Sequence, residues 1–328
     1  MSDAKAVSVP HTSVELSIVC PMHNEADGVE VFFSRINDAL KPLNVSFEII
    51  CVNDGSTDST LQQLLAFEKL DSAIRVIDLA RNFGKEAALT CGIDYARGKA
   101  VIPIDADLQD PPELIPEMIA LWRQGFDVVL PQRIDRQSDG FLKRKTAEWF
   151  YKVHNAISEP KMMANVGDFR LMDRQVIEAL QQLPERRRFM KGIFAWVGFR
   201  QALIPYTRAP RATGRSKFSG WKLWNFGLEG ITSFSTAPLR IWFYLGLIVA
   251  ALAFVYGSII IGRVLLFGRD TPGYASMITV ILFLGGIQLI GLGILGEYLG
   301  RIYQETKQRP VYIVRQEYRE NKTPCEGC

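Results

Sequence analysis

The sequence predicts an α/β domain with a mostly parallel sheet, followed by two transmembrane helices. Three observations support this fold class. Short apolar runs alternate with amphipathic segments over the first part of the chain, which is typical of strands joined by crossover helices. Polar clusters follow several of these runs. Near the C-terminus, two uncharged stretches are long enough to cross a bilayer.

Strands and helices are expected in regular alternation. The apolar runs predict strands at residues 16–20, 47–52, 74–79, 101–104 and 128–130, and the amphipathic segments predict helices at 28–40, 57–70, 85–95 and 112–122. In parallel sheets of this kind, ligands bind beyond the carboxyl ends of the strands. The residues that follow each run are therefore the first candidates for a site.

Polar clusters follow the first, second and fourth runs, at residues 21–25, 53–56 and 105–109. Because the ends of parallel strands meet at one edge of the sheet, the three clusters together predict a binding site there. The segment from Asp54 to Thr57 also suits a simple turn and helix N-cap, and this alternative stays open.

Asp105 and Asp107 directly follow the fourth run. Alternate residues of an extended segment point the same way, so the two carboxylates can share one target. Two close carboxylates repel each other unless a cation lies between them, and oxygen ligands beside a diphosphate typically hold Mg²⁺ or Mn²⁺. Arg133 follows the fifth run and is placed to reach phosphates, with an ordinary surface arginine as the less favoured alternative.

Composition and motifs argue against several classes of protein. The net charge of +3 is too small to indicate a nucleic-acid-binding protein. No G-x-G-x-x-G follows the first predicted strand, which argues against a Rossmann dehydrogenase. The pair Gly84-Lys85 lacks the spacing and the Ser or Thr of a nucleotide-binding P-loop.

The two predicted spans are residues 241–261 and 271–296. The loop between them carries only Arg263 and Arg269 as cations, whereas the outer flanks are richer in Lys and Arg. The positive-inside rule therefore puts the catalytic domain and both termini in the cytoplasm. Glycines in the second span favour close helix contact. We expect a short strand at residues 309–314 that pairs with another subunit, and hence a homo-oligomer.

Five regions are expected along the chain: a polar N-terminal segment (1–14), the catalytic domain (15–210), a juxtamembrane amphipathic segment (211–238), the membrane hairpin (239–300) and a cytoplasmic tail (301–328). The spans indicate that an acceptor comes from the membrane, and a lipid phosphate fits. Cations beside the membrane would bind it, and Arg144, Arg211, Arg215 and Lys217 qualify.

Several motifs closely resemble those of family 2 glycosyltransferases. They are Pro21-x-x-Asn24-Glu25, the segments at 53–60, 81–85 and 105–113, Gly167-Asp168-Phe169-Arg170, and Arg211-x-x-Gly214-x-Ser216-Lys217. Within that family the chain looks like the polyprenyl-phosphate glycosyltransferases, relatives of dolichol-phosphate mannose synthase. The bacterial bactoprenol glucosyltransferases with two C-terminal spans look most similar.

The resemblance implies a GT-A (Rossmann-like) fold, a divalent metal and an inverting transfer. The implied nucleotide-sugar site is Pro21, His23, Glu25, Val52, Asp54, Lys85, Asp105, Ala106 and Arg133, although relatives usually carry Tyr at the position of His23. The implied metal ligands are Asp105, Asp107 and Gln109. The lipid-phosphate group is Arg144, Arg211, Ser216 and Lys217, and the implied catalytic residues are Asp107, Asp168 and Arg133.

We therefore expect a multi-pass enzyme of a bacterial inner membrane, with Mg²⁺ or Mn²⁺ as cofactor. It would transfer a hexose, glucose from UDP-glucose in the first instance, to undecaprenyl phosphate at the cytoplasmic leaflet. Transfer of another sugar is an open alternative. A processive polysaccharide synthase is disfavoured because no Gln-x-x-Arg-Trp motif follows Asp168. A non-catalytic subunit of a lipid-linked sugar translocator is the alternative from another class.

Overall fold

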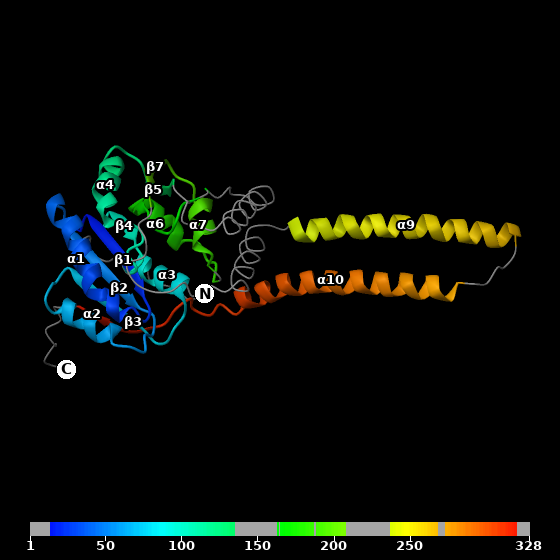
Figure 1. The fold of residues 1–328 in the computed structure, drawn as a ribbon, viewed down its shortest axis with the longest axis horizontal. Helices are drawn as coiled ribbons and strands as arrows, with labels where there is room; N and C mark the ends of the chain where they lie inside the picture. Colours follow the sequence, from blue (N-terminus) through cyan, green and yellow to red (C-terminus); the bar gives the residue numbers. More distant parts are fainter. Residues whose placement is uncertain are drawn as a thin grey trace, which may run out of the picture.

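The computed structural model describes residues 14–134, 163, 165–186, 188–207, 237–267 and 273–319. Figure 1 shows an α/β domain from which two long helices extend side by side. Nearly all of the predicted N-terminal segment 1–14 and juxtamembrane segment 211–238 lies outside the described residues. The boundaries predicted for these regions stay predictions.

The α/β domain is built on an eight-stranded sheet with the strand order β7-β5-β6-β4-β1-β2-β3-β8. The strands are β1 (Leu16–Met22), β2 (Phe47–Asn53), β3 (Ile74–Leu79), β4 (Ala100–Pro103), β5 (Val128–Arg133), β6 (Leu171–Asp173), β7 (Gln201–Tyr206) and β8 (Val314–Tyr318). Strand β6 runs antiparallel to β4 and β5, and β8 runs antiparallel to β3, while the other pairs are parallel. The predicted mostly parallel sheet is confirmed.

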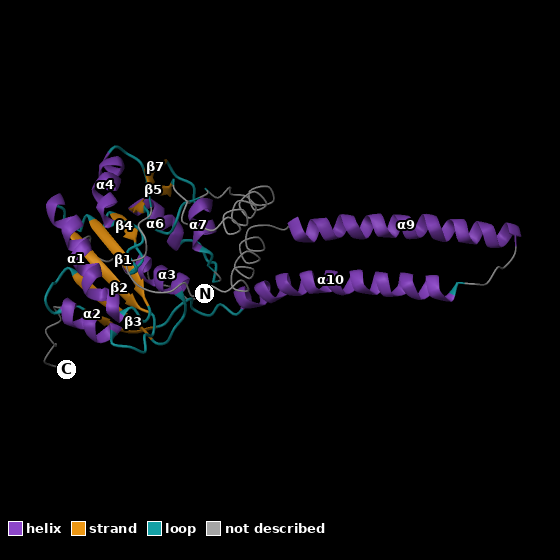
Figure 2. Ribbon diagram, in the orientation of Figure 1, coloured by secondary structure: helices purple, strands orange, loops and turns teal. Residues whose placement is uncertain are grey.

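Helices cover both faces of this sheet (Figure 2). Helices α1 (Val29–Leu40), α2 (Thr60–Glu68) and α4 (Ile115–Arg123) pack on one face, and α3 (Lys85–Tyr95), α6 (Arg174–Gln181) and α7 (Met190–Trp196) on the other. The alternation of side chains along β1 explains the two cores. Ile18 and Cys20 belong to the α1 face and Val19 to the α3 face, as expected for a strand buried on both sides.

The five predicted strands and four predicted helices are all present, with small shifts at their ends. Helix α2 begins at Thr60 rather than near residue 57, because side chains hold the preceding residues in a loop. The Thr57 amide donates to Asn24 Oδ1 at 2.8 Å, and the Thr60 amide donates to Asp58 Oδ1 at 3.0 Å. Side-chain acceptors of this kind compete with the first helical turn. The described part of the domain also contains three short 3-10 turns, η1 (Ala26–Gly28), η2 (Lys41–Leu43) and η3 (Pro112–Leu114).

The tail strand differs from our expectation in position and in partner. It begins at Val314 rather than near residue 309, and it pairs with β3 of its own chain instead of another subunit. The segment after the second long helix runs back along the domain to reach β3 (Figure 1). Without β8, β3 would leave an open row of backbone donors and acceptors at the sheet edge.

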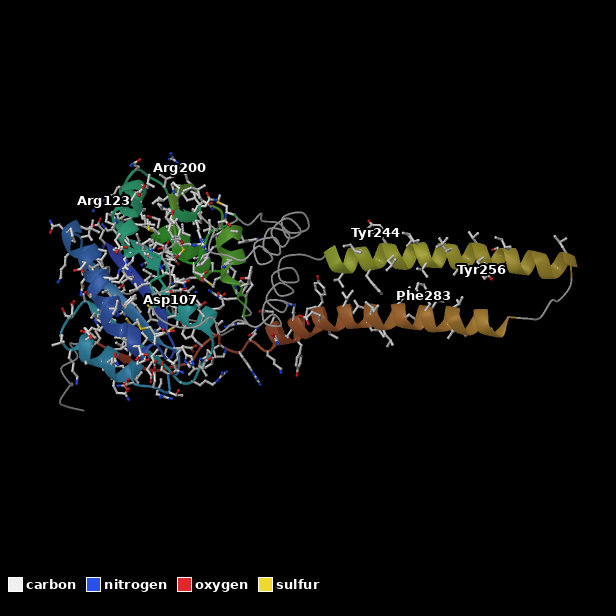
Figure 3. All side chains as sticks on the ribbon, viewed as in Figure 1. Asp107, Arg123, Arg200, Tyr244, Tyr256 and Phe283 are labelled. Carbon is white, nitrogen blue, oxygen red and sulfur yellow. The ribbon has the colours of Figure 1, made fainter. Side chains whose placement is uncertain are left out.

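The two long helices are α9 (Ala237–Phe267) and α10 (Tyr274–Thr306). Their apolar windows, Ile241–Ile259 and Phe283–Thr306, are long enough to cross a membrane, and only 0% and 6% of these windows is buried inside the protein. Apolar side chains such as Tyr244, Tyr256 and Phe283 are exposed along the hairpin (Figure 3). Core helices of a soluble protein would bury such surface, so the exposed apolar surface favours a lipid environment.

The helix contact expected from the glycines of the second span occurs within one chain at one position. A Cβ atom added at Gly291 of α10 would overlap the indole of Trp242 on α9. Only a residue without a side chain allows this approach, as is usual where small residues bring membrane helices together.

Candidate functional site

The polar clusters predicted at the strand ends do meet at one edge of the sheet. Pro21 at the end of β1 and Val52 at the end of β2 are register partners in the parallel sheet. Just beyond them, the Asp54 amide donates to Met22 O at 2.9 Å. The loop after β1 and the loop after β2 therefore begin side by side.

These two loops interlock through side chains that bond across them. The amide of Asn24, a residue with φ 54°, donates to Ser56 Oγ at 3.1 Å. The Glu25 amide donates to Thr60 Oγ1 at 3.0 Å. His23 Nδ1 lies 2.9 Å from Asp54 O and 3.0 Å from Asn82 Nδ2. The three loops after β1, β2 and β3 thus form one continuous surface.

Asp54 fixes the loop that follows β3. Its carboxylate is buried and accepts hydrogen bonds from the Phe83 amide (2.7 Å) and the Gly84 amide (2.9 Å). Asp54 does not cap α2, whose N-cap is Ser59. The predicted helix cap is therefore not formed by Asp54, which holds the loop after β3 instead.

Gly55 allows the loops after β2 and β3 to approach this closely. Its φ is +61°, and a Cβ atom there would lie 2.5 Å from Arg81 C and from Asn82 N. Any side chain at this position would clash with backbone and would also adopt a strained conformation.

Lys85, the first residue of α3, joins two carboxylates from distant parts of the chain. Its Nζ lies 2.7 Å from Asp105 Oδ1, 2.8 Å from Asp105 Oδ2 and 2.9 Å from Asp168 Oδ2. Asp105 follows β4 and Asp168 precedes β6, so the ammonium holds together two strand ends separated in sequence. The structure thus pairs Asp105 with Asp168 through Lys85.

The charges in this cluster perturb one another. Burial raises the pKa of the Asp105 carboxyl, even though Lys85 acts to lower it. Burial also acts to raise the pKa of Asp168, but Lys85 and Lys191 outweigh it, and this pKa is lowered. For Lys85, the two carboxylates overcome burial and raise the pKa of the ammonium. At neutral pH the ammonium is therefore charged between the two carboxylates.

The loop after β4 brings further acids to the same region. Leu108 has φ 50°, and the Gln109 amide donates to Asp107 Oδ1 at 3.2 Å, so a tight turn holds the Asp107 side chain. Asp107 belongs to the α/β domain, away from the helical hairpin (Figure 3). Asp110 is buried and accepts a hydrogen bond from Tyr206 Oη at 2.7 Å.

Two buried groups beside the cluster lack hydrogen-bond partners among the described residues, Asp168 Oδ1 and Arg170 Nε. The Arg170 guanidinium stacks on Phe194, 4.1 Å from the ring centroid, and donates to Gly167 O at 2.6 Å. Burial lowers the pKa of Arg170 to about 10. A polar atom left unsatisfied inside a protein is costly, so these atoms favour a ligand or water at this position.

Sequence reasoning missed Glu86, whose environment is unusual. Burial, reinforced by Asp168, raises its pKa to about 7, and its carboxylate accepts a hydrogen bond from the Met190 amide at 3.2 Å. Its place directly after Lys85, the last residue of the motif at 81–85, was the available signal. Asn24 and Asn82, which tie the loops together, were quoted in motifs but were not given roles.

The remaining predicted residues divide into three groups. Val52 and Ala106 are buried in the core, so their side chains offer little surface to a ligand. Arg133 ends β5, and its amide donates to Asn165 O at 3.1 Å, close to the Asp168 segment. The predicted lipid-phosphate residues Arg144, Arg211, Ser216 and Lys217, together with Arg215, lie outside the described residues.

The residues of this site fit a divalent cation of the magnesium type. No group of three or more His, Cys, Asp or Glu side chains in the described part of the chain could hold a metal by itself. Mg²⁺, however, typically takes one or two protein carboxylates and completes its shell with substrate phosphates and water. Of the predicted ligands Asp105, Asp107 and Gln109, the structure places Asp105 against a cationic group, the Lys85 ammonium, and holds Asp107 in the turn that follows. Asp168, on the same ammonium, has one oxygen without a partner among the described residues.

The chain is similar to two known protein families, each over a separate part, and to several relatives over most of its length. The family described as "Glycosyl transferase family 2" matches residues 17–181, and "GtrB C-terminal hairpin" matches residues 237–302. An uncharacterised glycosyltransferase of Synechocystis sp. is 55% identical over 302 residues, covering 92% of this chain and 95% of the relative. The SfII prophage-derived bactoprenol glucosyl transferase of Shigella flexneri is 54% identical over 310 residues, covering 94% of this chain and 100% of the relative.

Among solved structures, a mannosyltransferase from Pyrobaculum calidifontis, in complex with GDP-Man and Mn²⁺, is 15% identical with a TM-score of 0.47. That match covers 91% of this chain and 88% of the other.

Proposed function

The chain belongs to glycosyltransferase family 2, and from that membership we propose that it transfers glucose from UDP-glucose to a polyprenyl phosphate, undecaprenyl phosphate in a bacterium. The relative from Shigella flexneri is a bactoprenol glucosyl transferase matched over its whole length. The observation that carries the proposal is the acidic cluster at the carboxyl edge of the sheet, where Lys85 holds Asp105 and Asp168 together.

In the proposed reaction, an oxygen of the acceptor phosphate forms a bond to C1 of the glucose. The bond between C1 and the diphosphate oxygen breaks, and its electron pair leaves with UDP. A phosphate acceptor is already an anion at neutral pH, so no strong general base is required. One displacement from the face opposite the leaving group gives inversion at C1.

The residues at the carboxyl edge of the sheet have different roles in the proposed transfer. The loops after β1 and β2, which include His23, Glu25 and Asp54, bind the nucleoside. Asp105, Asp107 and Gln109 face the diphosphate, where a bound Mg²⁺ or Mn²⁺ would neutralise the charge that develops on the leaving group. Asp168 is proposed beside the sugar.

Arg133, at the end of β5, adds positive charge for the donor phosphates. We propose that Arg144, Arg211, Ser216 and Lys217 bind the acceptor phosphate at the membrane surface, where juxtamembrane cations favour an anionic lipid headgroup. A bidentate arginine is well suited to hold such a phosphate in line with C1.

The exposed apolar hairpin supports a membrane setting for this reaction. Helices α9 and α10 would span the bilayer, and the excess of cations outside the spans favours a cytoplasmic catalytic domain and cytoplasmic termini. A lipid acceptor anchored in the same membrane would then meet a soluble donor at the cytoplasmic leaflet. A homo-oligomer remains part of the proposal.

The test is a transfer assay with the full chain in detergent or lipid. Purified protein is incubated with Mg²⁺, undecaprenyl phosphate and one radiolabelled donor at a time, UDP-glucose, UDP-galactose, UDP-N-acetylglucosamine or GDP-mannose. We expect a labelled lipid with UDP-glucose, and none when the acceptor is left out. Labelled lipid with another donor alone would refute the choice of sugar, and no labelled lipid with any donor would refute the proposed reaction.

A further inference from the structure

Lys85 lies where a divalent cation would be expected in the proposed reaction. Its ammonium contacts both oxygens of Asp105, at 2.7 and 2.8 Å, and one oxygen of Asp168 at 2.9 Å. Two carboxylates that converge on a single point form a cation site. In this structure the cation at that site is a side chain of the protein.

The side chain of Lys85 is more exposed than the two carboxylates that it contacts. The side chain of Asp168 is 15% exposed and that of Asp105 is 31% exposed, while that of Lys85 is 47% exposed. Lysine carries its charge on a flexible four-carbon stem. The ammonium can therefore leave the carboxylates without repacking the core.

The backbone of Lys85 is tied to the expected nucleoside site. Asp54 accepts hydrogen bonds from the two residues that precede Lys85, at 2.7 and 2.9 Å. The stem of Lys85 therefore starts directly after the loop that Asp54 holds. A donor diphosphate attached to a nucleoside at these loops would bring negative charge to the same edge of the sheet as the Lys85 ammonium.

We propose that Lys85 is an exchangeable internal cation, which occupies the metal position in the donor-free enzyme and passes to the donor diphosphate when metal and donor bind. This inference rests on the proposed function and adds a role for one residue. An ammonium and a divalent ion cannot both contact the Asp105 carboxylate, because like charges at such short range repel strongly. The incoming diphosphate supplies the anion that Lys85 needs after it leaves.

The exchange makes metal binding and donor binding cooperative. Without donor, a metal ion must displace Lys85 into water, so its affinity is reduced. With UDP present, the displaced ammonium gains a new partner, so UDP should raise the affinity for metal by roughly 5- to 150-fold, the usual range for coupling between two sites. The same coupling must appear in the affinity for UDP when metal is added.

The test measures Mn²⁺ binding to the full detergent-solubilised chain by the electron paramagnetic resonance signal of free Mn²⁺, with and without UDP. For wild type we expect weak binding that UDP strengthens. For Lys85→Met we expect Mn²⁺ to bind about tenfold or more tightly without UDP, and the coupling to UDP to be largely lost. For Lys85→Arg, which keeps the positive charge, Mn²⁺ should bind weakly without UDP, as in wild type.

The matched control is Lys191→Met on α7. Lys191 contributes positive charge near Asp168, but it forms no ion pair with that carboxylate in the described part of the chain. Its removal should change Mn²⁺ affinity by less than about threefold, well below the roughly tenfold tightening expected for Lys85→Met. Thermal unfolding checks that each variant is folded.

Unchanged or weaker Mn²⁺ binding by folded Lys85→Met, in the absence of UDP, would overturn the inference. Equal tightening by Lys191→Met would also overturn it, because the effect would then be general electrostatics. If wild type bound no Mn²⁺ even with UDP, the metal requirement of the proposed function would fail. An enzyme that is active and binds Mn²⁺ with UDP, but shows no change on Lys85→Met, would contradict only the exchange.

Discussion

Replacing Asp54 tests whether the loop after β3 is part of the donor site. Asp54→Ala removes the acceptor of two backbone hydrogen bonds, from the Phe83 amide at 2.7 Å and the Gly84 amide at 2.9 Å. Hydrogen bonds to a charged group contribute about 1.5–3 kcal/mol each, so the pair stabilises the closed loop by about 3–6 kcal/mol. Asp54→Asn keeps one acceptor oxygen and should cost about half as much.

The free energy lost with these hydrogen bonds can lower either the affinity for UDP or the free energy of unfolding. If the loop opens locally, donor binding must close it again, and the lower estimate of about 3 kcal/mol corresponds to a roughly hundredfold weaker affinity for UDP. If the loop stays closed with unsatisfied amides, the cost appears in the free energy of unfolding instead. Isothermal titration with UDP and Mn²⁺ measures the first, and thermal unfolding measures the second.

The control is Asp38→Asn, the removal of an exposed carboxylate on α1. Surface substitutions of this kind usually change stability by about 0.5 kcal/mol or less. UDP affinity and stability, taken together, should decrease in the order wild type, Asp54→Asn, Asp54→Ala. If Asp54→Ala matched Asp38→Asn in both measurements, the argument for the loop would be refuted.

Three further predictions address the rest of the molecule. Arg75→Met leaves buried Glu48 without its ion-pair partner at 2.7 Å, so unfolding should become easier by about 3–5 kcal/mol, measured by denaturant titration; an unchanged midpoint would contradict this. Burial holds the pKa of Glu86 at about 7, above its ordinary 4.5. The stabilisation that the protonated carboxyl gives the folded state is therefore fully present below pH 4.5 and is lost as pH rises to 7. Glu86→Gln should therefore flatten the fall in melting temperature between these pH values, and an unaltered fall would count against it. Gly291→Leu should force the hairpin apart at Trp242 and quench or shift the indole fluorescence, while an unchanged spectrum would show that the helices do not touch there.

Much of the catalytic domain follows from sequence periodicity, because its strands are buried on both faces. The run at β2, for example, is apolar over nearly its whole length, and its bounds are close to those predicted. The start of α2 was wrong by three residues because Asn24 and Asp58 hold the preceding residues through contacts that no local pattern contains. Periodicity reports local preference, and such contacts are tertiary.

The sequence predicted where the site lies more accurately than it predicted which side chains contact one another there. Asp105 was placed at the correct edge because a polar residue that ends a buried strand must lie there. Its pairing with Asp168 through Lys85 joins residues far apart in the chain, so only the fold could reveal it. The tail strand was misplaced for the same reason, since its partner β3 lies more than 200 residues earlier.

The most direct test of the central claim compares wild type with Asp105→Asn in the transfer of labelled glucose from UDP-glucose to undecaprenyl phosphate. Asp105→Asn keeps the size of the side chain but removes the charge that would hold the cation, so a folded variant should lose about a hundredfold or more of the rate. Wild type should form labelled lipid in a reaction that EDTA stops and Mn²⁺ restores. Equal rates for the two proteins would contradict the account.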